Sequence, residues 1–461
     1  GAGQDGFAVT SIAVNTNTTI DAGAGNDALE IGDVLTEISS DLLVRGGAGD
    51  NDTLVIKSTT DSNLRLKSDR GGQLGFLLGA PGEIAFEQFS SLALALGDSP
   101  DRLVIEDTLV PLFVDAGGGV EDSIEILTLS APTTIATGEG TDVVTVFQTA
   151  APLTVNGTGS GNDTLIIDRV TSSQPITSGA VRNGRIDGVT ASEILFNAIE
   201  SLSVRLGAGN DVLEVDHSLP ETVVSINGDQ GDDSFNVLSL GDLETTLIGG
   251  SGEDTVRVVV DGMPQDQQFT TLKLSTETLM VDNSSNTGAS AIPVAWTHRT
   301  GMIEADTIPA SGRVDVISTT GADLTRIIGG SEADTLEIVS ETVSDIVGFI
   351  DDDRVELRSG LRVLQPEDPP GFTTLNNFDQ VISFDLMPSG KLYKEDGYQV
   401  IGDDPFVIDT GVVSPAARGK QFTLTRLDDG AFTIFSVDLD GPAGTNVDVS
   451  GITINGSYED L

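Results

Sequence analysis

The sequence predicts an all-β protein, a parallel β-solenoid followed by an antiparallel β-sandwich. Three observations predict it: an acidic turn motif with a fixed period, alternating apolar residues on both sides of that turn, and a glycine-rich composition. The clearest copies, VRLGAGNDVLEV, INGDQGDDSFNV and LIGGSGEDTVRV, lie within Val204–Val260. Their matching aspartates, Asp211, Asp233 and Asp254, are spaced 22 and 21 residues apart. A repeat of this length is typical of solenoids.

The amino-acid composition argues against nucleic-acid binding and against association with a membrane. The 461 residues include 54 glycines, no cysteine and a formal net charge of −49. Nucleic-acid binding needs clustered Lys and Arg, so no nucleic-acid partner is expected. An anionic membrane surface is disfavoured for the same reason. No run of about 18 apolar residues occurs, so no membrane span is expected.

The flanking segments alternate apolar and polar residues, as in LEV, FNV and VRV. A period of two indicates β-strands. A coil of about 21 residues has room for two or three short strands and their turns. We expect successive coils over residues 1–365 to pair in parallel, in a right-handed β-helix or β-roll with the apolar faces stacked inside.

Two longer intervals, of 49 and 48 residues, interrupt the regular spacing of the motif aspartates. They recur at an offset of about 111 residues, which predicts a super-repeat. The flanking text agrees, because FEQFSSLALALG at Phe86–Gly97 matches FNAIESLSVRLG at Phe196–Gly207, and a decayed third copy begins near Glu277. We expect each long interval to continue the solenoid for about two coils, with a looped-out insertion as the alternative. The chain starts inside the motif, at GAGQD, so we expect it to be a piece of a longer polypeptide.

The acidic turns are the candidate site. Glycine permits the positive φ and close backbone approach that such turns need. Stacked coils lie about 4.8 Å apart, so the carboxylates of one column would repel one another. Calcium, which binds six to eight oxygens, would remove this conflict; alternatively, each Asp bonds the backbone of its turn. The predicted ligands are Asp5, Asp27, Asp52, Asp122, Asp142, Asp163, Asp211, Asp232, Asp233, Asp254 and Asp334, with Asp101, like Asp334, a weaker candidate because its turn lacks the second glycine.

The turns GGSGEDTVRV, GAGNDVLEV and NGTGSGNDTLII resemble the calcium-binding nonapeptide G-G-x-G-x-D-x-U-x of RTX proteins. RTX repeats come every nine residues, whereas these come about every 21, so one column of calcium sites is expected. The long-period arrangement resembles the very large repetitive surface proteins of bacteria. This resemblance implies a calcium-stabilised structural or adhesive segment, extracellular or at the cell surface. Implied partners are calcium ions, polysaccharide or other surface protein chains, and further copies in a filament.

The composition changes after PEDPPGF at residues 366–372, within a predicted linker over 366–374. Residues 375–461 contain all three tyrosines and alternating segments such as QFTLTRL and AFTIFSVDL, which predict an antiparallel β-sandwich. This part resembles the carbohydrate-binding-like sandwich of PEP-CTERM-type exported proteins. A carbohydrate-binding module on a β-helical spacer is therefore an alternative function.

We do not expect an enzyme. Parallel β-helices also include polysaccharide lyases and epimerases, which remain a second alternative, but these need a positioned base and a basic groove. The two histidines, His217 and His298, stand in dissimilar contexts, and both are expected at the surface.

Overall fold

The computed structural model describes residues 2–48, 51–60, 62–69 and 73–260, then residues 268–269, 272–284, 294–299, 301–307 and 315–329, and the strands β32 to β42. The chain divides into two units, residues 1–235 with 239–252, and residues 236–238 with 253–461. The regular secondary structure of the described residues is β-strand, joined by turns; among them the one helical element is a 3₁₀ turn at Leu35–Glu37. None of the described helical structure is long and apolar enough to cross a membrane.

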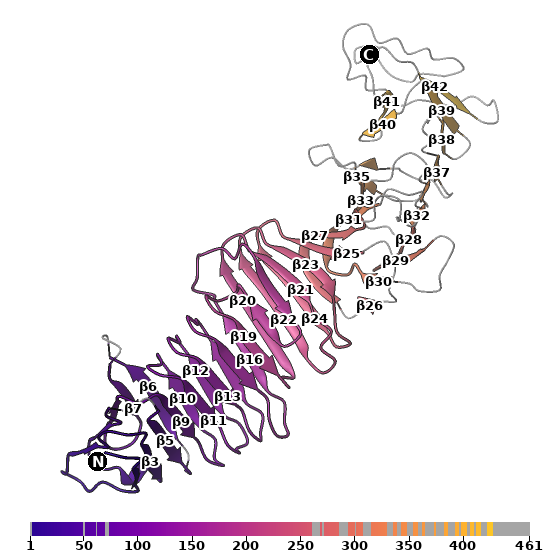
Figure 1. Cartoon of the computed structure of the whole chain (residues 1–461). Coiled ribbons are helices and arrows are strands. Elements are labelled where there is room, and N and C mark those ends of the chain that lie inside the picture. The colour runs from indigo at the N-terminus through magenta and orange to yellow at the C-terminus, as the bar shows by residue number, and fades with distance from the viewer. Residues whose placement is uncertain are drawn as a thin grey trace. The chain divides into compact units, whose positions relative to one another are not determined.

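The first unit is a two-sheet parallel solenoid (Figure 1). Its regular coils each contribute one strand to each sheet. Strands β11 (Leu112–Asp115), β13 (Thr133–Ala136) and β15 (Leu153–Asn156) are parallel neighbours in the first sheet, and β12 (Ser123–Ile126), β14 (Val143–Val146) and β16 (Thr164–Asp168) in the second. The predicted parallel solenoid is confirmed.

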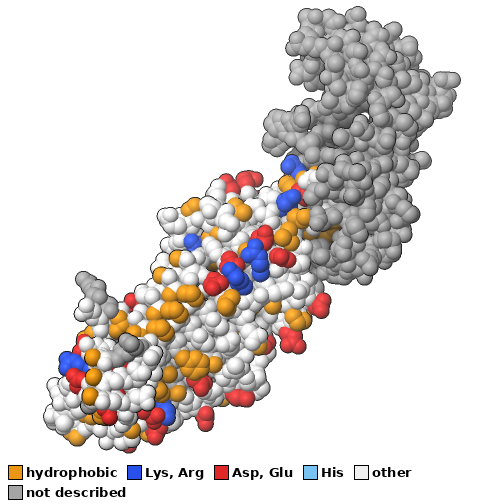
Figure 2. All heavy atoms as spheres, in the orientation of Figure 1, with side chains coloured by type: hydrophobic (Ala, Val, Ile, Leu, Met, Phe, Trp, Pro, Cys, Tyr) orange, Lys and Arg blue, Asp and Glu red, His pale blue; other side chains and the backbone are white. Residues whose placement is uncertain are grey.

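The alternating residues divide between the interior and the surface. Ile124 and Ile126 of β12 are 2% and 0% exposed, and Val144 and Val146 of β14 are equally buried. Residues between them face outward, and Phe113 on β11 is 44% exposed. On the visible face, hydrophobic, acidic and basic side chains are interspersed (Figure 2). The core is therefore the space between the two sheets, filled by stacked aliphatic side chains.

Each long interval continues the solenoid, as expected, because its outer strands pair in parallel with the coils on either side. It does so as an antiparallel meander in one sheet, and not as two regular parallel coils. Strand β6 (Asn63–Ser68) pairs antiparallel with β7 (Gly75–Leu78), which pairs antiparallel with β8 (Ile84–Glu87). The second interval repeats this with β17 (Gly179–Arg182), β18 (Arg185–Asp187) and β19 (Ile194–Asn197). The outer strands of both meanders rejoin the solenoid in parallel, β6 beside β10 (Arg102–Ile105) and β17 beside β21 (Val212–Asp216). The two copies of the predicted super-repeat therefore have the same order and pairing of strands.

The meanders exchange the roles of the two sheets. Before the first meander, the turn containing Asp27 leads from β2 (Thr18–Asp21) in the second sheet to β3 (Ala28–Asp33) in the first. After it, the turn containing Asp122 leads from the first sheet to the second. After the second meander, the turn containing Asp211 leads from β20 (Ser201–Ala208) in the second sheet back to the first. The acidic turns therefore change from one edge of the solenoid to the other, and the expected single column is wrong.

The remaining strands of this unit extend the same two sheets. They are β1 (Gly6–Val9), β4 (Leu42–Arg45), β5 (Thr53–Ser58), β9 (Ser91–Ala95), β22 (Val223–Gln230) and β24 (Thr245–Ser251), and β23 (Ser234–Ser239) spans the division between the units.

The second unit continues with parallel strands and then becomes antiparallel. Strands β25 (Thr255–Val259), β27 (Leu272–Asp282), β31 (Ala322–Ile328), β33 (Val343–Val347) and β35 (Arg362–Leu364) pair in parallel, and β36 (Thr373–Thr374) pairs antiparallel with β35. A third meander joins β28 (Val294–Arg299), β29 (Met302–Thr307) and β30 (Asp315–Ser318), with β26 (Gln268–Phe269) beside β30, β32 (Thr335–Ile338) beside β28 and β34 (Arg354–Leu357) beside β32.

The predicted change to antiparallel pairing follows. Strands β37 (Ile382–Asp385), β38 (Leu392–Glu395), β39 (Tyr398–Gly402) and β42 (Phe422–Arg426) form an antiparallel series, and β40 (Phe406–Asp409) with β41 (Val412–Pro415) forms a hairpin. Most of the predicted linker, and residues 427–461 of the predicted sandwich, lie outside the described residues.

The close stacking of turns predicts that a single methyl group will disrupt them. A Cβ on Gly161, where φ is +153°, would lie 1.4 Å from the carbonyl oxygen of Gly140 in the neighbouring coil. We expect Gly161→Ala to lower the denaturation midpoint by an amount equivalent to about 1–3 kcal/mol. Gly6→Ala, where a Cβ meets no atom within 4 Å, is the control. Equal midpoints for the two variants would contradict this packing.

Candidate functional site in the acidic turns

The motif aspartates are buried inside the turns. Asp122, Asp142 and Asp211 are 1%, 2% and 1% exposed, although each stands in a polar, glycine-rich loop. Asp27, Asp52, Asp101, Asp163, Asp233 and Asp254 are buried as well. Asp5 is half-buried, Asp232 is exposed, and Asp334 lies outside the described residues.

The buried motif carboxylates from Asp27 to Asp233 each accept a hydrogen bond from the backbone of the preceding coil. The N–H of Asp101 donates to Oδ1 of Asp122 at 2.8 Å, that of Asp122 to Asp142 at 2.7 Å, and that of Asp142 to Asp163 at 3.1 Å. The same bond joins Asp5 to Asp27, Asp27 to Asp52, and Asp211 to Asp233. We call each such series an aspartate ladder. It resembles the predicted bond from Asp to its turn, except that it links neighbouring coils.

Other residues begin and end the ladders. The N–H groups of Ser62 and Ile176 donate to Oδ1 of Asp101 and Asp211, at 2.6 and 2.5 Å. At the other end, the N–H of Asp163 donates to Oε2 of Glu200 at 2.7 Å. Glu277 accepts in the same way from Asp254 in the second unit, at 2.9 Å.

Neither glutamate was predicted as a ladder member. Both lie outside a Gly-x-Gly motif and directly before an apolar segment, in ESLSV and ETLMV; Glu200 precedes β20, whereas Glu277 lies within β27. The shared position of Glu before that apolar segment was the available signal.

Glycine is required across the turn because the carboxylate occupies the turn interior. A Cβ on Gly46 would lie 3.0 Å from Oδ2 of Asp52, and one on Gly228 would lie 1.9 Å from Oδ2 of Asp233. The motif therefore pairs its glycines with its aspartate for a steric reason as well as a conformational one.

The second carboxylate oxygens are poorly satisfied. Oδ2 is buried without a hydrogen-bond partner in Asp27, Asp52, Asp122, Asp142 and Asp211. Asp163 differs, because the hydroxyl of Thr137, one coil earlier, donates to its Oδ2 at 2.6 Å. Ala116 occupies the position of Thr137 in the coil before, opposite Thr137 in the parallel register, and offers Asp142 no hydroxyl. A buried charged oxygen without a donor is costly, so these atoms need a proton or a cation.

Burial also controls the electrostatics. It raises the pKa of Asp122 and of Asp142 to about 6, and neighbouring carboxylates of the ladder add to the effect. The pKa values of Asp163 and Asp211 are raised for the same main reason. Both histidines are fully buried, so the expectation that they lie at the surface is wrong. Burial lowers the pKa of His217 and of His298 to about 4.

The donor atoms of the ladders decide whether they can hold a metal ion. Among the described residues, no three or more His, Asp or Glu side chains lie close enough together to hold a metal ion. Each coil provides one inward carboxylate, and exposed Asp232 instead pairs with Asn210, whose Oδ1 lies 3.0 Å from the Asp232 nitrogen. The available donors are hard oxygens, which suit calcium, but most of its six to eight ligands would have to be backbone carbonyls or water.

Comparison with known proteins gives no matching family model and no matching curated protein. The resemblance to RTX repeats therefore depends on the turn motif alone.

Thr137 donates a hydrogen bond to a buried carboxylate and Ala116 cannot, which predicts that the Thr137 hydroxyl stabilises the folded protein. We expect Thr137→Ala to destabilise the protein by about 1–3 kcal/mol, because it removes a hydrogen bond to a buried charged group. Denaturant titration at neutral pH measures this, with Thr134→Ala on the outer face of the same coil as control. The loss should shrink in an Asp163→Asn background. An unchanged loss there would mean that the hydroxyl acts through other contacts.

The raised pKa values predict a pH dependence. A carboxyl whose folded pKa is near 6 and whose ordinary value is 3.8 contributes most stability below pH 4, and loses that contribution as the pH rises through 6. Each pKa unit is worth about 1.4 kcal/mol. With calcium chelated, the Asp122→Asn/Asp142→Asn double variant should therefore lose less stability than the wild type between pH 4 and 7. His217 and His298 act in the opposite direction in both proteins, so they cancel in the comparison. Parallel pH profiles would contradict burial of the two carboxyls.

Proposed function

We propose that this chain is a structural repeat segment, a solenoid spacer in a larger extracellular or cell-surface protein, stabilised by calcium. The observation that carries the proposal is the aspartate ladder, one buried carboxylate per regular coil, bonded to the backbone of the coil before. The residues most strongly constrained by the repeat thus hold one coil to the next. A carboxylate that bonds to the neighbouring coil stabilises the stack of coils, and a long stack can act as a spacer or scaffold.

We propose calcium because the buried carboxylates of the ladders carry negative charge that the ladders themselves do not neutralise. Near neutral pH the carboxyls of Asp122 and Asp142 are mostly ionised, since their pKa values are about 6. Their Oδ2 atoms have no donor. A divalent cation close to such oxygens would neutralise them, and a proton would do the same at lower pH. Calcium and protons would therefore compete, and calcium would matter most above pH 6.

A calcium titration tests the proposal. Melting temperatures are measured by circular dichroism at neutral pH, in EGTA and in calcium, with magnesium as a cation control. A ligand at 100 times its Kd stabilises the folded state by about 2.7 kcal/mol per site. We expect calcium to raise the melting temperature of the wild type, and to raise that of the Asp122→Asn/Asp142→Asn variant less. Asp242→Asn, which changes an exposed carboxylate outside the ladders and the predicted ligands, is the matched control and should respond as the wild type does.

Two results would contradict the proposal. If calcium leaves the wild-type melting temperature unchanged, the ladders are neutralised without it. If calcium stabilises the double variant as much as the wild type, the ion binds elsewhere.

A further inference from the structure

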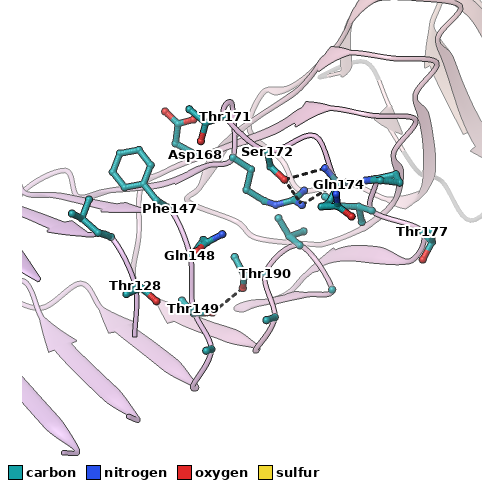
Figure 3. Close-up of a pocket in the computed structure, with 18 of the residues that line it drawn as sticks. Thr128, Phe147, Gln148, Thr149, Asp168, Thr171, Ser172, Gln174, Thr177 and Thr190 are labelled. Carbon is teal, nitrogen blue, oxygen red and sulfur yellow. Dashed lines mark hydrogen bonds between the residues drawn. The ribbon is translucent and has the colours of Figure 1, made fainter. Parts of the chain in front are cut away.

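An open recess of about 890 Å³ lies between the second meander and the corner turns of the preceding coils (Figure 3). Its lower wall consists of the corner turns of neighbouring coils, including Phe147 and Gln148, together with the turn at residues 188–191. Its upper wall is the segment 169–178, which joins β16 to β17. The corresponding segment of the first meander, 59–62, has four residues in place of ten. The recess is thus a departure from the repeat.

The upper wall is held open by specific bonds. The guanidinium of Arg169 donates to the carbonyl oxygens of Leu206 and Gln174, each at 3.1 Å, and to Oγ of Ser172 at 3.2 Å. The N–H of Ile176 is bonded to Asp211, where the next ladder begins. Bonds therefore hold this segment near both of its ends.

Charged groups at the recess already have partners. Asp168 pairs with Arg205 at 3.4 Å, and Arg169 is occupied by the segment that it holds. The remaining polar lining is neutral. Residues 73–260, which include the whole recess, are described without a gap. Among them, the side chains of Thr128, Gln148 and Thr171 make no hydrogen bond, whereas the hydroxyls of Thr149 and Thr190 bond each other at 2.9 Å. In Figure 3, Gln148 and Thr190 lie between the two walls, with Phe147 beside them.

This chemistry suits a neutral sugar. Hydroxyl and amide side chains both donate and accept hydrogen bonds, as a sugar hydroxyl does. A half-buried aromatic ring offers a negative face to the C–H side of a pyranose. The volume is within the usual range for small-ligand sites. A peptide added as a strand is disfavoured because β17, β18 and β19 are each paired on both sides.

We propose that this recess binds a neutral saccharide of one or two residues, with Gln148 and the threonine hydroxyls as hydrogen-bonding groups and Phe147 as the stacking surface. The site would give the spacer a carbohydrate-binding activity separate from its aspartate ladders.

Saturation-transfer NMR and calorimetry on the full chain test the proposal. The probes are maltose, cellobiose, lactose and xylobiose, with digalacturonate and chitosan disaccharide as charged counterparts. At least one neutral disaccharide should bind, and Gln148→Ala and Phe147→Ala should each weaken it about tenfold or more. Thr134→Ala and Phe113→Ala, which replace an outward-facing hydroxyl and an outward-facing aromatic residue outside the recess, should bind as the wild type does.

Three results would overturn the proposal: no binding by any neutral disaccharide, stronger binding of the charged ones, or affinity unchanged by both recess variants. The titrations are run in EGTA and again in calcium. Binding is expected in both, so a failure here leaves the calcium-dependent melting result as a separate outcome.

Discussion

The hydrogen bond from a backbone N–H to a buried aspartate of the next coil is the constraint on which this structure depends. Burial of stacked aliphatic residues is the larger driving force, but it is non-directional and would tolerate a shift between coils. The ladder bond is directional and joins the same position in each regular coil, as from Asp101 to Asp122 and from Asp122 to Asp142. It also accounts for the nearly constant period and for the glycine that faces each carboxylate. Its cost is the second oxygen, which is buried without a hydrogen-bond donor in several of these turns.

The meanders limit how far this cost accumulates. In the first unit, the ladder from Asp101 ends after Asp163, where Glu200 accepts the last bond, and the next ladder begins at the other edge with Asp211. The negatively charged carboxylates are therefore divided among several short aspartate ladders. Each meander also permits variation in the length of the segment that leads into it, although that segment still bonds to the next motif turn through Ser62 or Ile176. The recess beside Arg169 arises in this way, from a longer segment in the second meander than in the first.

Much of the fold could be predicted from the sequence because its two periods are local. Alternation within a strand and the recurrence of the turn are both visible in a few dozen residues, and parallel stacking follows from them. The direction of short strands is not visible in this way, so the meanders of β6–β8 and β17–β19 were not predicted. Most aspartates of the ladders were predicted, but Glu200 and Glu277 and the geometry of the ladders were not. An aspartate in a glycine turn suggests exposure, whereas Asp142 is enclosed by the adjacent coil. His217 was similarly misplaced, because its burial depends on distant residues such as Thr245, whose Oγ1 lies 3.3 Å from its Nε2.

A crystal structure at atomic resolution tests the central claim most directly. The account predicts that Oδ1 of Asp122 and of Asp142 lies within hydrogen-bonding distance of the backbone nitrogen one coil earlier, near the 2.8 and 2.7 Å found here. It also predicts ladders on opposite edges before and after each of the first two meanders. Carboxylates of Asp122 and Asp142 that point into solvent, with no bond to the neighbouring backbone, would contradict it.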